Sequence, residues 1–265
     1  MDNNKLSNCG WVMPIHNAPD YVERSLSFIV ENYSNKYGMT GITVQDASNQ
    51  ETLDRTMAVI KTKKNGKFYG VSWKQQQLFT RTVNIGIRNL YMWDPELTHY
   101  FIVNSDCDLK EGCFEMLLKA FEDDPTIGIA GYTDSPQHGD PLLTYVEDPG
   151  YVTGHMFCVK KEVFETIGVF CETDLGGPTT TYPEFAPFKG LAHIGSDRLF
   201  SNDARKAGFK TVYVNYPGVE HQAGKSWNHD LGWLANFNLE LLWEPTNELV
   251  VPGLLEPKFI GAINE

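Results

Sequence analysis

The chain has 265 residues, of which 42% are hydrophobic and 21% are charged. This length suits one large α/β domain, and the composition is that of a chain that folds throughout. The formal net charge of -12 at pH 7 opposes general attraction to nucleic acid or to anionic membrane surfaces. We therefore expect residues 1–265 to form a single domain that does not depend on polyanions for binding.

The cysteines and the apolar runs bear on the cellular compartment. The five cysteines form an odd set without a Cys-x-x-Cys pair, which favours reduced, buried thiols over a disulfide framework. No opening stretch combines basic residues with a long apolar run, and no apolar run approaches the roughly 20 residues of a membrane-spanning helix. The sequence predicts a cytoplasmic protein without an integral membrane segment, and it leaves the oligomeric state open.

Strand-like and helix-like patterns alternate along the first half of the chain. Short apolar runs predict strands at 11–15, 42–44, 68–71 and 100–103. Apolar residues at helical spacing predict helices at 19–33, 79–90 and 114–121. This alternation is typical of parallel βαβ units with helices on both faces of a sheet, which collect ligands at the carboxyl ends of the strands.

The second half is less regular. The pattern predicts a strand at 127–130, an extended segment at 151–159, a helix at 199–207 and a last strand at 211–214. Gly208 is the residue type expected just past a helix C-terminus. A Gly/Pro/Thr-rich stretch at 175–189 is a candidate lid or acceptor loop.

Two carboxylates follow the strand at 100–103 closely. Asp106 and Asp108 flank one residue, so both can point from the strand end toward a shared cation. Mg²⁺ and Mn²⁺ prefer oxygen ligands and are usually held by one or two carboxylates together with substrate phosphates. An acidic loop or a helix start is the alternative, but two like charges about 4 Å apart repel by about 4 kcal/mol at an effective dielectric of about 20. A bound divalent cation is therefore the favoured interpretation.

With its neighbours, this pair resembles the metal site of GT-A glycosyltransferases, close to the large family-2 type. In the first half the matching residues are 12–17 with Tyr21 and Val22, Asp46-Ala47-Ser48, Asn84 with Gly86, and Asp106-Cys107-Asp108. In the second half they are Gly154, 159–170, Ser196-Asp197, 207–210, and His221 with Gly224-Lys225-Ser226. The resemblance covers roughly residues 10–228. It implies a mixed, mainly parallel sheet with helices on both faces, a nucleoside-diphosphate sugar as donor, and a divalent metal.

The resemblance also implies a role for each matching residue. In a nucleotide-sugar half at about 1–110, the sugar donor would contact Pro14, Ile15, His16, Asn17, Asp46, Ser48, Arg81, Asn84 and Asp106. The metal, Mn²⁺ or Mg²⁺, would be held by Asp106, Asp108 and His221. In an acceptor half at about 111–228, the acceptor would contact Gly154, His155 and Trp227. Residues 229–265 would form a C-terminal helix and tail.

Asp197 is the candidate general base. Its carboxylate would deprotonate an acceptor hydroxyl as that hydroxyl attacks the anomeric carbon opposite the departing diphosphate, which inverts the anomeric centre. A capping residue at the start of the last helix is the alternative. The residue before it is Ser196 where the family has Glu, which leaves a retaining mechanism open.

Three further site residues have structural alternatives. A single histidine after a strand, such as His221, is often a satisfied structural residue rather than a metal ligand. His155 could be a polar residue on a half-buried strand. Trp227 could pack against the last helix instead of stacking on a sugar ring.

Other functional classes are weighed by their motifs. Neither the P-loop pattern nor Gly-x-Gly-x-x-Gly occurs, and the loop at 14–17 is not the Gly-rich basic loop of a sugar nucleotidyltransferase. A non-catalytic protein that binds a nucleotide sugar remains the alternative to an enzyme. The expected sugar donor is a UDP-sugar. The acceptor could be a glycan, a lipid-linked sugar, a protein or a hydroxymethylated base in phage DNA, although the acidic charge opposes DNA.

Overall fold

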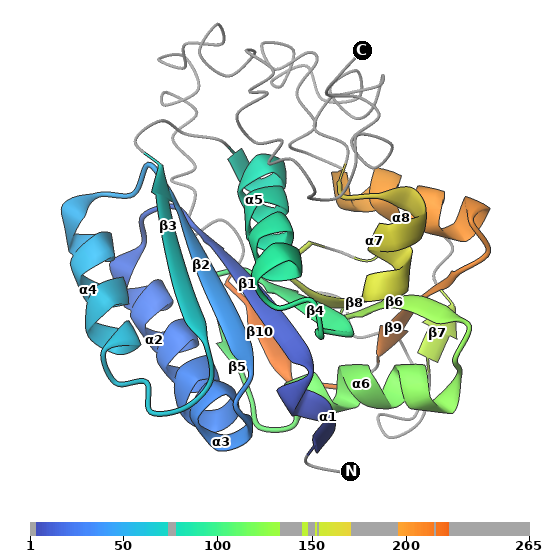
Figure 1. The fold of residues 1–265 in the computed structure, drawn as a ribbon, viewed down its shortest axis with the longest axis horizontal. Helices are drawn as coiled ribbons and strands as arrows, with labels where there is room; N and C mark the ends of the chain where they lie inside the picture. Colours follow the sequence, from blue (N-terminus) through green and yellow to red (C-terminus); the bar gives the residue numbers. More distant parts are fainter. Residues whose placement is uncertain are drawn as a thin grey trace, which may run out of the picture.

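The computed structural model describes residues 4–73, 78–132, 145–147, 152, 154–170, 196–214 and 216–222, shown in colour in Figure 1. The strands are β1 (Cys9–Ile15), β2 (Thr40–Asp46), β3 (Phe68–Trp73), β4 (His99–Val103), β5 (Cys107–Leu109), β6 (Ile127–Gly131), β7 (Tyr145–Glu147), β8 (Met156–Lys160), β9 (Lys210–Val214) and β10 (Val219–His221). The helices are α1 (Asn4–Ser7), α2 (Pro19–Ile29), the π-helical η1 (Val30–Ser34), α3 (Asn35–Tyr37), α4 (Gln50–Ile60), α5 (Leu78–Trp93), α6 (Cys113–Asp123), α7 (Lys161–Ile167) and α8 (Ser196–Lys206).

The strands form one large sheet and one small one. The eight-stranded sheet has the order β3-β2-β1-β4-β8-β6-β9-β7, and a two-stranded sheet pairs β10 with β5. Parallel pairs join β3, β2, β1 and β4 on one side of β8, and β6 with β9 on the other. β8 runs antiparallel to both β4 and β6, and β7 is antiparallel to β9. The predicted mixed, mainly parallel sheet is confirmed.

The core consists of two apolar layers, one on each face of the large sheet. Because successive side chains of a strand point to opposite faces, β1 places Trp11 and Met13 in one layer and Val12 in the other. The first layer includes apolar residues of α2, α4 and α6, and the second those of α5, α7 and α8. Helices therefore cover both faces, as Figure 1 shows.

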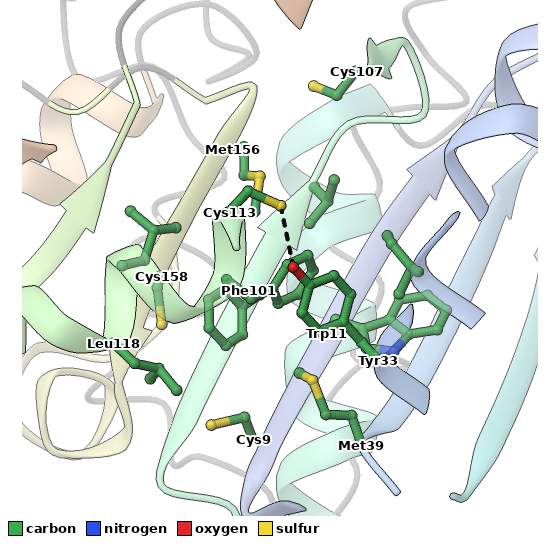
Figure 2. Packing of buried hydrophobic residues seen from close by; sticks show 14 of the residues in the cluster. Cys9, Trp11, Tyr33, Met39, Phe101, Cys107, Cys113, Leu118, Met156 and Cys158 are labelled. Carbon is green, nitrogen blue, oxygen red and sulfur yellow. Dashed lines mark hydrogen bonds between the residues drawn. The ribbon is translucent and has the colours of Figure 1, made fainter. Parts of the chain in front are cut away.

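The first layer is rich in aromatic rings and thiols. Trp11, Tyr33 and Phe101 lie close together in Figure 2, where the Tyr33 hydroxyl is hydrogen-bonded to the Cys113 sulfur at 3.7 Å. Burial raises the pKa of the Cys113 thiol to about 12. Cys9, Cys107, Cys113 and Cys158 are buried thiols, as the sequence predicts, while Cys171 lies outside the described residues.

His99, at the start of β4, is a titratable residue whose imidazole is largely removed from solvent. Its ring packs on Phe121 with centroids 5.0 Å apart. Burial, followed by the charge of Lys160, lowers the pKa of His99 from 6.5 to about 4. Since this pKa is depressed in the folded state, His99 contributes stability that is complete above pH 6.5 and is lost as the pH falls toward 4.

Most predicted elements have a counterpart in the structure. The strands predicted in the first half lie within β1, β2, β3 and β4, and those at 127–130 and 211–214 within β6 and β9. The extended segment at 151–159 is shorter than predicted, because a turn at 154–155 precedes β8. Of the described helices, none is long and apolar enough to cross a membrane.

Helix α4 was not predicted, since its sequence reads as a polar stretch. It begins after Asn49, whose side chain accepts a hydrogen bond from the Thr52 amide (2.9 Å) and so caps the first turn. Its buried residues are Thr52, Thr56 and Val59, so the buried face carries little apolar signal. The loop at 175–189 and the tail at 229–265 lie outside the described residues, and the division into two halves remains a prediction.

Candidate active site

The two carboxylates of the Asp-x-Asp segment lie where β4 gives way to β5. After Val103 the chain turns, and the Cys107 amide donates a hydrogen bond to the Asn104 carbonyl (3.3 Å). Asp106, within the turn, is 2% exposed, whereas the side chain of Asp108 on β5 is 29% exposed. One carboxylate is therefore buried and the other reaches the surface.

Helix α2 holds this turn through two consecutive residues. The buried Ser25 hydroxyl lies 2.8 Å from the Ser105 carbonyl oxygen and 2.5 Å from the Cys107 carbonyl oxygen. These two carbonyls flank Asp106 along the chain, so the contact fixes the backbone on both sides of the buried carboxylate. The preceding residue, Arg24, forms an ion pair with Asp108.

Strand β10 brings a histidine to the same place. β10 pairs antiparallel with β5, with His221 opposite Cys107, and the two strands lie side by side in Figure 1. His221 Nε2 is 3.4 Å from Asp106 Oδ1. The adjacent Gln222 donates its side-chain amide to Asp108 Oδ2 (3.0 Å) and its backbone amide to the Asp106 carbonyl (3.0 Å). Strand pairing thus joins the three residues predicted to form the metal site.

His155, predicted to contact the acceptor, is packed against His221. The two imidazole rings are stacked, with centroids 4.9 Å and planes 10° apart. His155 is buried, and its carbonyl accepts a hydrogen bond from the Asn104 amide (2.8 Å). The structure therefore links His155 to the metal-site candidates, and its contact with an acceptor remains a prediction.

The loop predicted to bind the sugar donor is braced by the end of β2. His16 Nδ1 lies 2.6 Å from the Asp46 carbonyl oxygen. The Asn17 amide donates to the Ser48 hydroxyl (3.3 Å), which in turn donates to the Ile15 carbonyl (3.1 Å). The ends of β1 and β2 thus form one connected unit. Its members are residues that the sequence predicted to contact the sugar donor.

This unit contains strained backbone. Asn17, Ala18 and Ala47 have φ angles of 55°, 58° and 51°, in the left-handed region. That conformation costs roughly 1–2 kcal/mol for a residue other than glycine, and such strain is concentrated at binding and catalytic sites. Pro14 and Ile15 have buried side chains in β1, and their contact with a sugar donor remains a prediction.

The Asn84-x-Gly86 pattern on α5 has a packing function. Asn84 is buried and pairs reciprocally with the backbone of Phe170, donating to its carbonyl (2.8 Å) and accepting from its amide (3.0 Å). A Cβ on Gly86 would lie 2.3 Å from Val12 Cγ1, so only glycine lets α5 approach β1 this closely. This structural role of Asn84 was not foreseen, and its contact with a sugar donor remains a prediction. Arg81, one turn earlier on α5, is half-buried.

Asp197 lies in the first turn of α8 and faces the turn that precedes β8. Its Oδ2 accepts a hydrogen bond from the Gly154 amide (2.9 Å). A Cβ on Gly154 would be 3.4 Å from that oxygen and 3.4 Å from the Phe79 ring, so Gly154 lies in van der Waals range of both. The candidate base thus contacts a predicted acceptor residue. Trp227 lies outside the described residues.

The three predicted metal ligands do not form a complete coordination site in this structure. Among the described residues, no three His, Cys, Asp or Glu side chains are arranged to hold a metal ion. Asp106 and His221 approach each other, but the Asp108 oxygens are engaged by Arg24 and Gln222. Two carboxylates and one imidazole have the chemistry of a site for a hard divalent cation. The metal site at these three residues remains a prediction, and it requires Asp108 to give up its ion pair with Arg24.

Comparison with known proteins finds likeness in fold alone. No family model matches the sequence, and neither does any curated protein. The mannosyltransferase PcManGT from Pyrobaculum calidifontis, solved with GDP-Man and Mn²⁺, has a TM-score of 0.57 at 15% identity over 97% of this chain and 68% of its own. S. aureus TarS 1-349, solved with UDP, has a TM-score of 0.54 at 12% identity over 80% of this chain and 59% of its own.

A third structure, GalNAc-T7 with UDP, GalNAc and Mn²⁺, has a TM-score of 0.55 at 14% identity over 80% of this chain and 43% of its own. The chain thus spans less than two thirds of the length of TarS 1-349 and GalNAc-T7. Each of the three structures is similar to this chain in fold and was solved with a nucleotide or a nucleotide sugar. The protein has the GT-A fold that the resemblance of its sequence predicted, and its likeness to these three structures confirms that fold.

Proposed function

We propose that the protein is a metal-dependent glycosyltransferase that transfers a sugar from a UDP-sugar to an acceptor hydroxyl. The observation that carries the proposal is the pairing of β10 with β5, which places His221 against Asp106 and beside the Asp-x-Asp strand. The three similar structures support it, because each contains a nucleotide and two contain Mn²⁺. We infer that the protein is a soluble enzyme that acts on sugar nucleotides in the cytoplasm.

The metal would be Mn²⁺ or Mg²⁺, held by Asp106, Asp108 and His221. Such an ion neutralises the charge of a departing diphosphate. The burial of Asp106 supports this role, because a carboxylate removed from water is stabilised by a cation. His221 and the backbone amide of Gln222 hold the turn that presents the carboxylate.

The sugar donor would bind across the carboxyl ends of β1 and β2. His16, Asn17, Asp46 and Ser48 meet there, and ligands of open α/β sheets bind at such strand ends. The strained loop would fit the base and ribose through its backbone shape, with Pro14 and Ile15 setting that shape. Arg81 would add positive charge for the diphosphate, while Asn84 supports the helix on which Arg81 lies.

Asp197 would act as the general base. It would take the proton of the acceptor hydroxyl while that oxygen bonds to the anomeric carbon, and the bond to the diphosphate breaks on the opposite face. The result is inversion at the anomeric centre. The Gly154 amide, which donates to Asp197, would orient the carboxylate, and Gly154, His155 and Trp227 would line the acceptor side. The acceptor we propose is a glycan, and a lipid-linked sugar or a modified DNA base would be tested next.

The test is release of nucleoside diphosphate from a panel of UDP- and GDP-sugars with Mn²⁺, first without acceptor. We expect slow release from one UDP-sugar that is abolished by EDTA and by Asp106→Asn. The matched control is Asp203→Asn, which makes the same change at a surface carboxylate that pairs with Lys206 on α8. This control should release diphosphate at the wild-type rate.

Binding of the bare nucleotides separates the alternatives. Metal-dependent binding of UDP without release from any donor, with or without glycan acceptors, would favour the non-catalytic protein. Absence of UDP and GDP binding in the presence of Mn²⁺ would refute the proposed function. Anomeric configuration of the product, read by NMR, would test inversion separately.

A further inference from the structure

The proposed metal site contains a cationic side chain that the proposed function leaves without a role. Arg24 on α2 forms its ion pair through Nε with Asp108 Oδ1, while Gln222 donates to Asp108 Oδ2 (3.0 Å). Both oxygens of the carboxylate are thus engaged by protein groups. A metal ion that binds Asp108 must displace at least one of them.

Arg24 is held in place by a second contact. Its guanidinium carbon lies 4.9 Å from the centroid of the Tyr21 ring, three residues earlier on the same face of α2. The Arg24 side chain is nevertheless 53% exposed, so it can turn into solvent without leaving a buried charge. The ion pair is therefore ordered but open to exchange.

We propose that Arg24 is the internal counter-ion of the metal site: it neutralises Asp108 in the metal-free protein and releases it when a divalent cation binds. This inference rests on the proposed function, since it takes Asp108 as a metal ligand. A guanidinium and a divalent cation repel each other at one carboxylate, so Arg24 weakens the binding of free metal.

The released guanidinium is free to bind a new anionic partner. A nucleoside diphosphate supplies one, because arginine binds phosphate oxygens through charge-assisted hydrogen bonds. Metal that arrives with a nucleotide therefore gains an interaction that free metal lacks. By linkage, Arg24 makes metal affinity depend on nucleotide, and nucleotide affinity depend on metal to the same extent.

The test is Mn²⁺ titration of the full chain, with the free ion followed by electron paramagnetic resonance, without and with UDP. We expect Arg24→Gln to bind Mn²⁺ alone about fivefold more tightly than wild type, the upper range for a partly exposed ion pair. UDP should then raise the Mn²⁺ affinity of Arg24→Gln less than that of wild type. Thermal melting without metal checks that the variant is folded.

Arg55→Gln is the matched control. It removes the same charge from α4, where Arg55 pairs with Asp20 and Glu23 of the neighbouring helix α2 and with Glu51 of its own helix. Its Mn²⁺ affinity should equal that of wild type. If Arg55→Gln binds Mn²⁺ as tightly as Arg24→Gln, net charge rather than the ion pair explains the effect, and the inference is overturned.

The remaining outcomes separate the inference from the proposed function. If wild type binds Mn²⁺ and Arg24→Gln binds it equally or more weakly, Arg24 is no competitor and the inference fails alone. If neither protein binds Mn²⁺, even with UDP, the metal site fails and the proposed function fails with it. Mn²⁺ binding by Arg24→Gln but not by wild type would be the strongest support.

Discussion

Removal of the Ser25 hydroxyl should reduce both stability and metal affinity. Ser25 is 1% exposed, and its hydroxyl is the contact from α2 to the Ser105 and Cys107 carbonyls on either side of Asp106. In Ser25→Ala these buried acceptors lose a donor, which costs about 1–3 kcal/mol. For a domain of this size, a loss of that order lowers Tm by about 5 °C.

The effect on metal binding follows from the backbone. A turn that is no longer fixed on both sides of Asp106 presents its carboxylate less well, and the loss of a residue that orients a ligand typically weakens metal binding by about tenfold. Thermal melting and Mn²⁺ titration measure the two effects separately. Ser25→Ala should therefore show a lower Tm together with weaker Mn²⁺ binding.

Ser34→Ala is the control for a lost buried hydrogen bond. Ser34 is fully buried and accepts a hydrogen bond from Trp11 Nε1 (3.1 Å) in the apolar layer. Its replacement should lower Tm to a similar extent without changing Mn²⁺ affinity. The reasoning would be refuted if Ser25→Ala kept wild-type Mn²⁺ affinity, or if Ser34→Ala weakened it equally.

Three further predictions concern packing and pH. Between pH 6.5 and 4, wild type should lose about 2–3 kcal/mol of unfolding free energy, because His99 is protonated mainly in the unfolded chain over this range. His99→Gln should lose less, as measured by urea unfolding. Gly41→Ala should destabilise by about 1–3 kcal/mol in thermal melts, because the new Cβ would lie 2.1 Å from the buried Trp11 ring. Asn84→Ala should lower Tm in thermal melts, because it leaves the buried backbone amide and carbonyl of Phe170 unpaired.

Each of these has a clear contrary result. Equal pH profiles for wild type and His99→Gln would show that His99 is not kept neutral by the fold. An unchanged Tm in Gly41→Ala would mean that the indole can move aside. An unchanged Tm in Asn84→Ala would show that the pairing with the Phe170 backbone adds no stability.

Local patterns in the sequence were sufficient for most strands and for the Asp-x-Asp segment. Apolar runs such as 11–15 and 100–103 become buried strands because both faces of a covered parallel sheet exclude water. Asp106 and Asp108 could be located because polar residues after such a run lie at the strand end. Helix α4 escaped prediction because the face it buries is largely threonine, which carries no helical apolar period.

The partners of the site residues were decided by the tertiary structure. Nothing near His221 in the sequence shows that it lies opposite Cys107, because strand pairing joins segments through backbone hydrogen bonds, which most residue types can form. Nor does the amphipathic pattern of α2 reveal that Arg24 reaches Asp108, since an exposed arginine on a helix looks alike whatever lies beside it. The sequence determined which residues have the chemistry of the site, and long-range packing determined which of them meet.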